Sequence, residues 1–149
     1  VMKILGIDYG QKRIGLALSD PSNMVARSLK VLKRNGTRKL LGEIKAVIDQ
    51  NKIERIVIGL PKNMNGSLGE KGNEVLAFVK VLEKVVKMPI VTWDERLTTV
   101  SAEKVLRQAE LSRKKRKDIL DKLSACIILQ NYLDSIGSDQ KERSEESNK

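Results

Sequence analysis

Residues 55–60 read RIVIGL, and Pro61 follows them directly. The run is apolar and rich in β-branched residues, and polar and apolar positions do not alternate within it. A continuous apolar run of this length is typical of a strand that is covered on both faces within a parallel sheet. We therefore predict an α/β protein in which this strand is parallel to its neighbours and ends before Pro61.

Three strand-like runs precede RIVIGL along the chain. Residues 4–8 and 13–19 are apolar, and the turn-forming stretch YGQK joins them, which predicts a hairpin. Residues 25–32 form a third run, which closes at an Arg-Asn-Gly turn. Over residues 37–52, leucine, isoleucine and valine recur at spacings of three and four, which predicts an amphipathic helix that Thr37 caps.

Helices and one more strand follow RIVIGL. Residues 73–86 predict a helix, residues 90–93 a short strand, and residues 100–109 and 119–133 two final helices. The order is therefore three strands, a helix, a strand, a helix, a strand and two helices. This order predicts a five-stranded mixed sheet that is antiparallel on one side and parallel on the other.

The composition limits both the compartment and the chemistry. The 149 residues fit one domain, residues 1–134, followed by a polar tail, residues 135–149, that we expect to be disordered. The chain has no histidine and a single cysteine, Cys126, which excludes an internal disulfide, a histidine-ligated zinc site and nucleophiles activated by histidine. Its apolar runs are far shorter than a membrane span, so we expect a cytoplasmic protein that does not bind membranes.

The charge indicates a polyanionic partner. Lys and Arg number 29 and Asp and Glu number 19, so the net charge is 29 − 19, or +10. The tail has four acids and three bases, which leaves +11 on residues 1–134. This excess is larger than solubility alone requires and favours nucleic acid. Aromatic residues make up only 3 %, so we expect recognition of backbone charge and shape, as in structured RNA, without a base-stacking platform.

Acidic residues stand where the predicted parallel strands end. Asp8 closes the first strand, Asp94 and Glu95 close the last strand, and Asp121 comes early in the final helix. The carboxyl ends of parallel strands gather at one edge of a sheet, where α/β proteins bind their ligands. Carboxylates gathered there suit the hard cations Mg²⁺ or Mn²⁺, which can activate water and stabilise a departing oxygen. Each acid also has a structural alternative, as a cap or a surface ion pair.

Candidates for phosphate binding lie around the same edge. Residues 59–72 form a glycine-rich loop, which we expect to be mobile and to close over bound phosphate, and which lacks the P-loop pattern. Residues 113–117 read RKKRK, a charge density that fits contact with phosphates better than a solvated helix end. The predicted nucleic-acid contacts are Lys12, Arg13, Lys62, Asn63, Arg96, Arg113, Lys114, Lys115, Arg116 and Lys117.

Four blocks of the sequence, in order, resemble the YqgF family. They are IDYG and KRIGLA within residues 7–17, VIGLPKNMNGS at residues 57–67, DERLTT at residues 94–99 and DKLSA at residues 121–125. The resemblance extends over about residues 2–134. YqgF proteins are similar to Holliday junction resolvases and have the ribonuclease H-like fold, so the resemblance implies a sheet with helices on both faces.

The resemblance also implies a function and a site. It implies a nuclease that matures the 5′ end of precursor 16S ribosomal RNA and uses Mg²⁺ or Mn²⁺. It places the catalytic and metal-binding acids at Asp8, Glu95 and Asp121, with Asp94 as an alternative ligand. Many of the better-known ribonuclease H-like nucleases have an acid where this strand ends in Gly-Leu-Pro, so the second ligand must come from residue 94 or residue 95.

Other functions remain open at this point. One is a Holliday junction resolvase that acts on branched DNA, and another is a module that binds nucleic acid without cleaving it. An ATP-binding fold of the actin type is disfavoured, because such proteins pair two domains and 149 residues supply one. The sequence leaves both a monomer and a homodimer open.

The basic run gives a first prediction. Replacing Lys114, Lys115 and Arg116 with alanine should weaken binding to every nucleic acid, because these side chains would contact phosphates and not bases. The dependence of log affinity on log salt should flatten by up to about 0.9 per lost contact on duplex DNA. Fluorescence anisotropy titrations over a series of salt concentrations measure both quantities. An unchanged affinity and slope at low salt would show that the run is only solvated.

Overall fold

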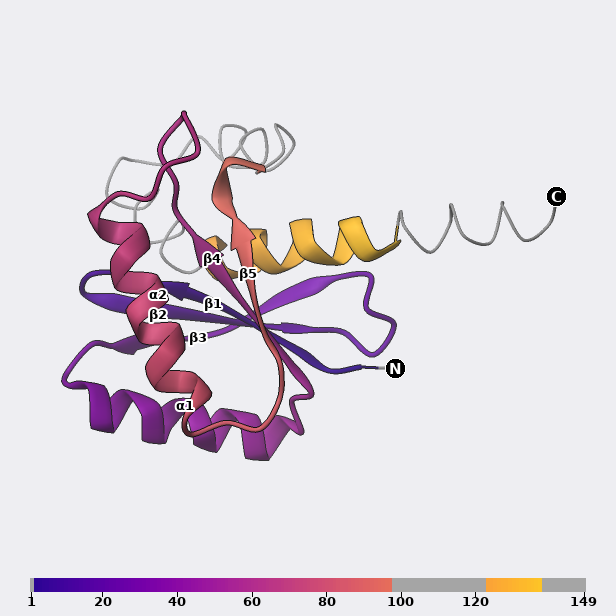
Figure 1. The fold of residues 1–149 in the computed structure, drawn as a ribbon. Coiled ribbons are helices and arrows are strands. Elements are labelled where there is room, and N and C mark those ends of the chain that lie inside the picture. The colour runs from indigo at the N-terminus through magenta and orange to yellow at the C-terminus, as the bar shows by residue number, and fades with distance from the viewer. Residues whose placement is uncertain (1, 98–122, 138–149) are drawn as a thin grey trace, which may run out of the picture.

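The computed structural model describes residues 2–97 and 123–137, which form a mixed sheet with helices on both faces (Figure 1). No helix within these two ranges is long and apolar enough to cross a membrane. The third described helix spans residues 123–137, and a short 3₁₀ helix, η1, spans Glu95–Leu97. The other elements are β1 (Ile4–Tyr9), β2 (Arg13–Ser19), β3 (Ala26–Lys33), α1 (Thr37–Asn51), β4 (Arg55–Leu60), α2 (Glu70–Glu83) and β5 (Ile90–Asp94).

The sheet has the strand order β3-β2-β1-β4-β5. β1 pairs antiparallel with β2, and β2 pairs antiparallel with β3. β4 lies between β1 and β5 and is parallel to both. The predicted mixed sheet is therefore confirmed. The RIVIGL run lacks alternation because its strand is covered on both faces: Ile56 and Ile58 belong to one core and Val57 to the other.

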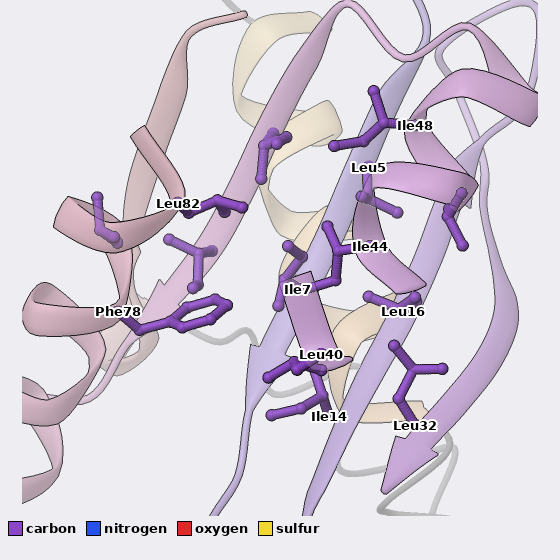
Figure 2. Close-up of a cluster of buried hydrophobic side chains, with 14 of the residues drawn as sticks. Leu5, Ile7, Ile14, Leu16, Leu32, Leu40, Ile44, Ile48, Phe78 and Leu82 are labelled. Carbon is purple, nitrogen blue, oxygen red and sulfur yellow. The ribbon is translucent and has the colours of Figure 1, made fainter. Parts of the chain in front are cut away.

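Helices α1 and α2 cover one face of the sheet and enclose the larger core. Figure 2 shows Leu40, Ile44 and Ile48 of α1 over the sheet, with Phe78 and Leu82 of α2 beside them. The periodic apolar residues of α1 are those that become buried, as expected of an amphipathic helix on a sheet. This core includes Leu5, Ile7, Ile14, Leu16, Ile56 and Ile58 of the strands.

The helix of residues 123–137 covers the other face and encloses a second core. A Cβ atom added to Gly6 would lie 2.8 Å from the Leu129 Cβ and 3.1 Å from the Ala125 carbonyl oxygen. Gly6 therefore allows this helix to pack almost against the backbone of β1. Towards the far end of the helix, the Arg55 side chain donates a hydrogen bond of 2.7 Å to the Tyr132 hydroxyl.

Some predicted boundaries differ from the structure. Thr37 is the first residue of α1 and not its cap; Gly36 occupies the cap position, with a φ of 103° and no side-chain hydrogen bond. α2 begins at Glu70, three residues before the predicted residue 73. Gly69 occupies its N-cap position, so the helix starts within the glycine-rich run that was predicted to be a loop. The last helix continues through residue 137, where Ile136 packs against the second core. The predicted helix 100–109 lies outside the described residues.

Gly6→Ala tests the close packing of helix and sheet. The added methyl group would collide with Leu129, so the free energy of unfolding should fall by about 1 to 3 kcal/mol. Gly42→Ala is the matched control, because Gly42 lies in α1 and an added Cβ there would have no atom within 4 Å beyond its own helical turn. That change should raise stability by about 0.5 to 1 kcal/mol. Urea unfolding measures both, and equal effects of the two substitutions would contradict the packing.

Candidate active site

Two acids meet at the edge where the parallel strands end. Asp8 is the last residue but one of β1, and Glu95 directly follows β5 in η1. β4 separates the two strands, and all three strands run in the same direction. Asp8 and Glu95 line one pocket of about 270 Å³. The sequence prediction that these two acids lie at one sheet edge agrees with this geometry.

Gly59, on the strand β4 between β1 and β5, makes room for the Glu95 carboxylate. A Cβ atom added to Gly59 would lie 2.5 Å from Glu95 Oε1 and 2.5 Å from the Ile128 Cδ1. Neither position is compatible with a real side chain. The Glu95 carboxylate therefore lies against the backbone of β4, in the space that a side chain at residue 59 would occupy.

Helix α2 supplies two pocket residues that the sequence analysis missed. Lys71 and Glu74 line the pocket together with Asp8 and Glu95. Lys71 was missed because the helix was predicted to begin at residue 73, which left residue 71 in a loop; Glu74 lay within the predicted helix but was not assigned to the site. Their spacing of three residues at a helix start, directly after the loop at the sheet edge, is the signal that could have found them. The pocket therefore contains a cation as well as acids.

Burial and a neighbouring charge perturb Glu95. The pKa of the Glu95 carboxyl rises from 4.5 to about 7, first because burial disfavours the charged form and then because the Asp8 carboxylate repels it. Lys71 acts in the opposite direction and lowers the pKa. A half-buried acid with a perturbed pKa in a pocket is a marker of functional sites.

Asp94 has a different environment from its neighbour Glu95. The Arg96 guanidinium holds the Asp94 carboxylate through Nε, 3.1 Å from each oxygen, and Nη2, 2.8 Å from Oδ2. Hydrogen bonds from Arg96 lower the pKa of Asp94 to about 2. Asp94 is thus engaged in a bidentate ion pair beside the pocket, whereas Glu95 faces into it. Of the two acids between which the sequence could not decide, Glu95 has the better position to bind a metal.

The loop of residues 61–69 joins the same edge and is internally hydrogen-bonded. The Asn63 amide N–H donates to the Ser67 carbonyl at 2.9 Å, and the Asn63 side-chain amide donates to the Ser67 hydroxyl at 3.0 Å. Arg96 Nη1 donates to the Met64 carbonyl at 3.3 Å, which connects the loop to the end of β5. Asn63 and Arg96 therefore organise the loop in this structure. The expected ordering of the loop by substrate stays a prediction.

The hairpin between β1 and β2 forms another wall of the pocket. Gly10 and Gln11 line it, and the Arg34 guanidinium donates to their carbonyl oxygens at 3.3 and 3.4 Å. The same guanidinium lies 4.5 Å from the centre of the Tyr9 ring, which stacks on Phe78 of α2 at 4.3 Å. Arg34 therefore ties the hairpin next to Asp8 to the rest of the fold.

The other predicted contacts divide between described and undescribed residues. Lys12 and Arg13 are exposed at the hairpin, and Lys62 lies near enough to Asp94 to lower its pKa. Asp121 and the basic run, residues 113–117, lie outside the described residues.

The described donors fit a divalent cation in part. Asp8 and Glu95 offer carboxylate oxygens, the ligands that Mg²⁺ and Mn²⁺ prefer, and a cation between them would relieve the repulsion that raises the pKa of Glu95. Within residues 2–97 and 123–137, no three Cys, Asp or Glu side chains lie close enough together to hold an ion. The carboxylates of Asp8 and Glu95 thus fit Mg²⁺ or Mn²⁺, and the remaining ligands of such an ion would come from groups other than these two acids.

Comparisons with known proteins identify relatives of the whole domain. A sequence model of the RuvX family, described as Holliday junction resolvase, matches residues 2–135. A Clostridium kluyveri protein named "Putative pre-16S rRNA nuclease" is 53 % identical over 135 residues, which cover 91 % of this chain and 98 % of that protein. A protein of the same name from Desulforamulus reducens is 49 % identical over 134 residues, covering 90 % and 98 %.

A solved structure shares the fold. RuvC of T. thermophilus, in complex with a Holliday junction substrate, matches with a TM-score of 0.63 at 17 % identity and covers 93 % of this chain and 97 % of that one. At this identity the match concerns the fold alone. It confirms the ribonuclease H-like, α/β fold that the sequence resemblance implied.

Glu95→Gln tests the raised pKa. Because the folded-state pKa lies above the unfolded value of 4.5, the stability of the wild type should fall as pH rises from 4.5 through about 7. The variant lacks this titration, so its advantage over the wild type should grow by about 1 to 2 kcal/mol between pH 5 and pH 8, allowing for solvent screening of a half-buried group. Urea unfolding at both pH values measures the difference, and parallel pH profiles would contradict the burial of a charged Glu95.

Proposed function

Since the chain belongs to the RuvX family of Holliday junction resolvases, we propose that it is a nuclease that hydrolyses phosphodiester bonds. Its proposed substrate is precursor 16S ribosomal RNA, cleaved during maturation of the 5′ end in the cytoplasm. Support for this substrate comes from relatives named "Putative pre-16S rRNA nuclease". About half of their residues are identical to those of this chain, and the match covers nearly their whole length. The net charge of +10 suits a polyanionic substrate.

The observation that carries the proposal is the shared pocket of Asp8 and Glu95. Two carboxylates at the carboxyl edge of parallel strands, one of them half-buried and with a raised pKa, form an oxygen-rich site without histidine. We assign the catalytic role to Asp8, Glu95 and Asp121. Asp8 lies at the end of β1 and Glu95 directly follows β5, with β4 between the two strands, and Asp121 comes from the family resemblance.

These three acids would hold the divalent ion, Mg²⁺ or Mn²⁺. When bound, such an ion supplies an activated water and stabilises negative charge on the reacting phosphate. Gly59 keeps the Glu95 carboxylate in place by leaving its position open. Lys71 faces the acids from α2, where its ammonium group balances part of their charge and can bind a phosphate oxygen.

Branched DNA is the second candidate substrate. The family description names Holliday junction resolvase activity, and a junction-binding RuvC shares the fold. Both substrates are structured nucleic acids, and both would be recognised through phosphates and shape. Lys12 and Lys62 directly follow the pocket residues Gln11 and Pro61 in the chain, and the predicted contacts Lys12, Arg13 and Lys62 suit either substrate. The assembly state, monomer or homodimer, matters for this choice, because two symmetric strands of a junction require two active sites.

Cleavage assays test the function directly. Precursor 16S ribosomal RNA and a four-way DNA junction are incubated with the protein, with and without Mg²⁺ or Mn²⁺. We expect metal-dependent cleavage of the RNA, and we expect Asp8→Asn to lower its rate by about 100-fold or more. The variant should fold normally, because removing one of two repelling charges does not cost stability.

Asp49→Asn is the matched control for this experiment. Asp49 is an exposed acid on α1, so the change removes the same charge away from the pocket and should leave the cleavage rate unaltered. Preferential cleavage of the junction would select the resolvase. Undiminished cleavage by Asp8→Asn, or equal losses in the two variants, would contradict the assigned site.

A further inference from the structure

Met64 is the most exposed large apolar side chain among the described residues. It is 96 % exposed, and the next, Met24, is 70 % exposed. Single exposed apolar side chains are common on protein surfaces and need no special explanation. Met64 differs in its position, because it lies in the loop of residues 61–69, which leaves the acidic pocket at Pro61 and returns to it at Lys71. An apolar side chain therefore stands in solvent beside the candidate active site.

Hydrogen bonds fix the backbone around Met64. The Gly66 amide donates to the Asn63 carbonyl at 2.9 Å, which closes a four-residue turn with Met64 at its second position. The Asn65 side-chain oxygen accepts hydrogen bonds from the Ser67 amide at 3.0 Å and from the Ser67 hydroxyl at 2.6 Å. Polar groups thus organise the turn, and the Met64 side chain takes no part in these bonds. A backbone that is ordered before binding loses less entropy when its side chain contacts a partner.

Arg96 connects this turn to the strand end that carries Glu95. Its Nη1 donates to the Met64 carbonyl at 3.3 Å, and its Nη2 lies 2.8 Å from the Asp94 carboxylate. A Cβ atom added to Gly66 would lie 3.4 Å from Arg96 Nη1, so the guanidinium packs closely against the turn. Figure 1 shows the loop between β4 and α2 extending beyond the end of β4, next to the end of β5.

The length of the loop limits how far Met64 lies from the pocket. Three residues of chain span at most about 11 Å, so Met64 is within that distance of Pro61 in the pocket wall. A pocket of about 270 Å³ admits the backbone of one strand but no double helix, so the bases beside a bound phosphate stay outside it. Successive bases follow at about 3.4 Å, and Met64 is therefore within about three base steps of the pocket wall.

The aromatic rings of the chain are already engaged with one another. The chain has two tyrosines, one tryptophan and one phenylalanine, and all four lie in the described residues. Tyr9 stacks on Phe78 with ring centres 4.3 Å apart, and Trp93 meets Tyr132 edge to face at 6.0 Å. Contact with an unstacked base therefore depends on an aliphatic side chain, and Met64 is the most exposed one beside the pocket.

We propose that Met64 is a wedge that enters the base stack of the nucleic acid next to the phosphate bound at the pocket. Methionine is among the apolar side chains that proteins insert between bases, and the insertion unstacks one step and bends the strand. The bend brings the backbone into the recess that holds Asp8 and Glu95. This inference rests on the proposed nuclease function and adds to it a positioning residue for the substrate. A poorly paired step costs least to open, so the wedge favours structured RNA or branched DNA over a regular duplex.

The fluorescence of 2-aminopurine tests the wedge, because this adenine analogue brightens when it leaves the base stack. The probes are a four-way DNA junction and a 5′ precursor fragment of 16S ribosomal RNA, with one adenine replaced at a time. Each probe is saturated with the Asp8→Asn protein, which prevents cleavage. We expect neighbouring positions at one step to brighten. Met64→Ala should remove this increase, and Met64→Leu should retain it, because leucine keeps an apolar group of similar size.

Single-turnover cleavage, with Asp8 intact, gives the second measurement. At saturating protein, Met64→Ala should lower the rate by about 10-fold or more, because a misplaced phosphate reacts slowly, and Met64→Leu should restore most of the rate. Met24→Ala is the matched control and should change neither measurement. Met24 is an exposed methionine in the turn between β2 and β3, which lies at the opposite edge of the sheet from Asp8. The Tm of Met64→Ala should equal that of the wild type, because the side chain buries almost no apolar area.

Several results would overturn the inference. They are the absence of brightening in both probes, an unchanged fluorescence increase in Met64→Ala, and an unchanged cleavage rate in that variant. If the wild type cleaves neither probe but Met64→Ala alone loses the fluorescence increase, the wedge stands and the nuclease assignment fails. If cleavage depends on Asp8 while Met64→Ala behaves like Met24→Ala, the nuclease stands and the wedge is rejected.

Discussion

The candidate site depends on how closely the helix of residues 123–137 approaches the sheet. Gly6 and Gly59 lie on the two central parallel strands, and an added side chain at either would strike this helix, at Leu129 or at Ile128. Because interiors are packed to near-crystalline density, a helix at this distance leaves space for few other groups. The Glu95 carboxylate occupies one such space over Gly59. The position of the Glu95 carboxylate therefore depends on the same close approach of helix and sheet that forms the second core.

Most of the fold could be predicted from the sequence, because strong local signals agreed with the final packing. RIGLALS and RIVIGL begin and end as predicted, since both are buried strands bounded by turn residues or proline. Thr37 failed as a cap because Gly36, with its positive φ, provides the chain reversal that starts α1. The start of α2 was predicted too late because glycine is typical of loops and residue 72 is a glycine. In the structure Gly72 is a buried residue of α2 that lies close to the Pro61 carbonyl oxygen.

The site was less accessible to prediction than the fold. Topology places Asp8 and residues 94–95 at one edge, and this much follows from strand order. Which of two consecutive acids turns inward depends on the backbone path after β5, where η1 begins and Arg96 captures Asp94. The Arg96 side chain, which binds Asp94, and Gly59 of β4, which leaves space for Glu95, decide which acid turns inward. Neither influence has a local sequence signal, so the sequence alone could not decide between Asp94 and Glu95.

Charge is arranged in this molecule so that attraction and repulsion act at different places. Asp8 and Glu95 repel a polyanion, and their recess at the sheet edge confines that repulsion to a pocket of about 270 Å³. Lys71 offsets part of the charge inside the pocket, while exposed cations stand outside it on the hairpin and the edge strand. Coulomb attraction outside the pocket acts across solvent and is weak for each contact, so several cations are needed to hold a phosphate backbone against the acids. The excess of ten positive charges therefore follows from the acidic chemistry as much as from the substrate.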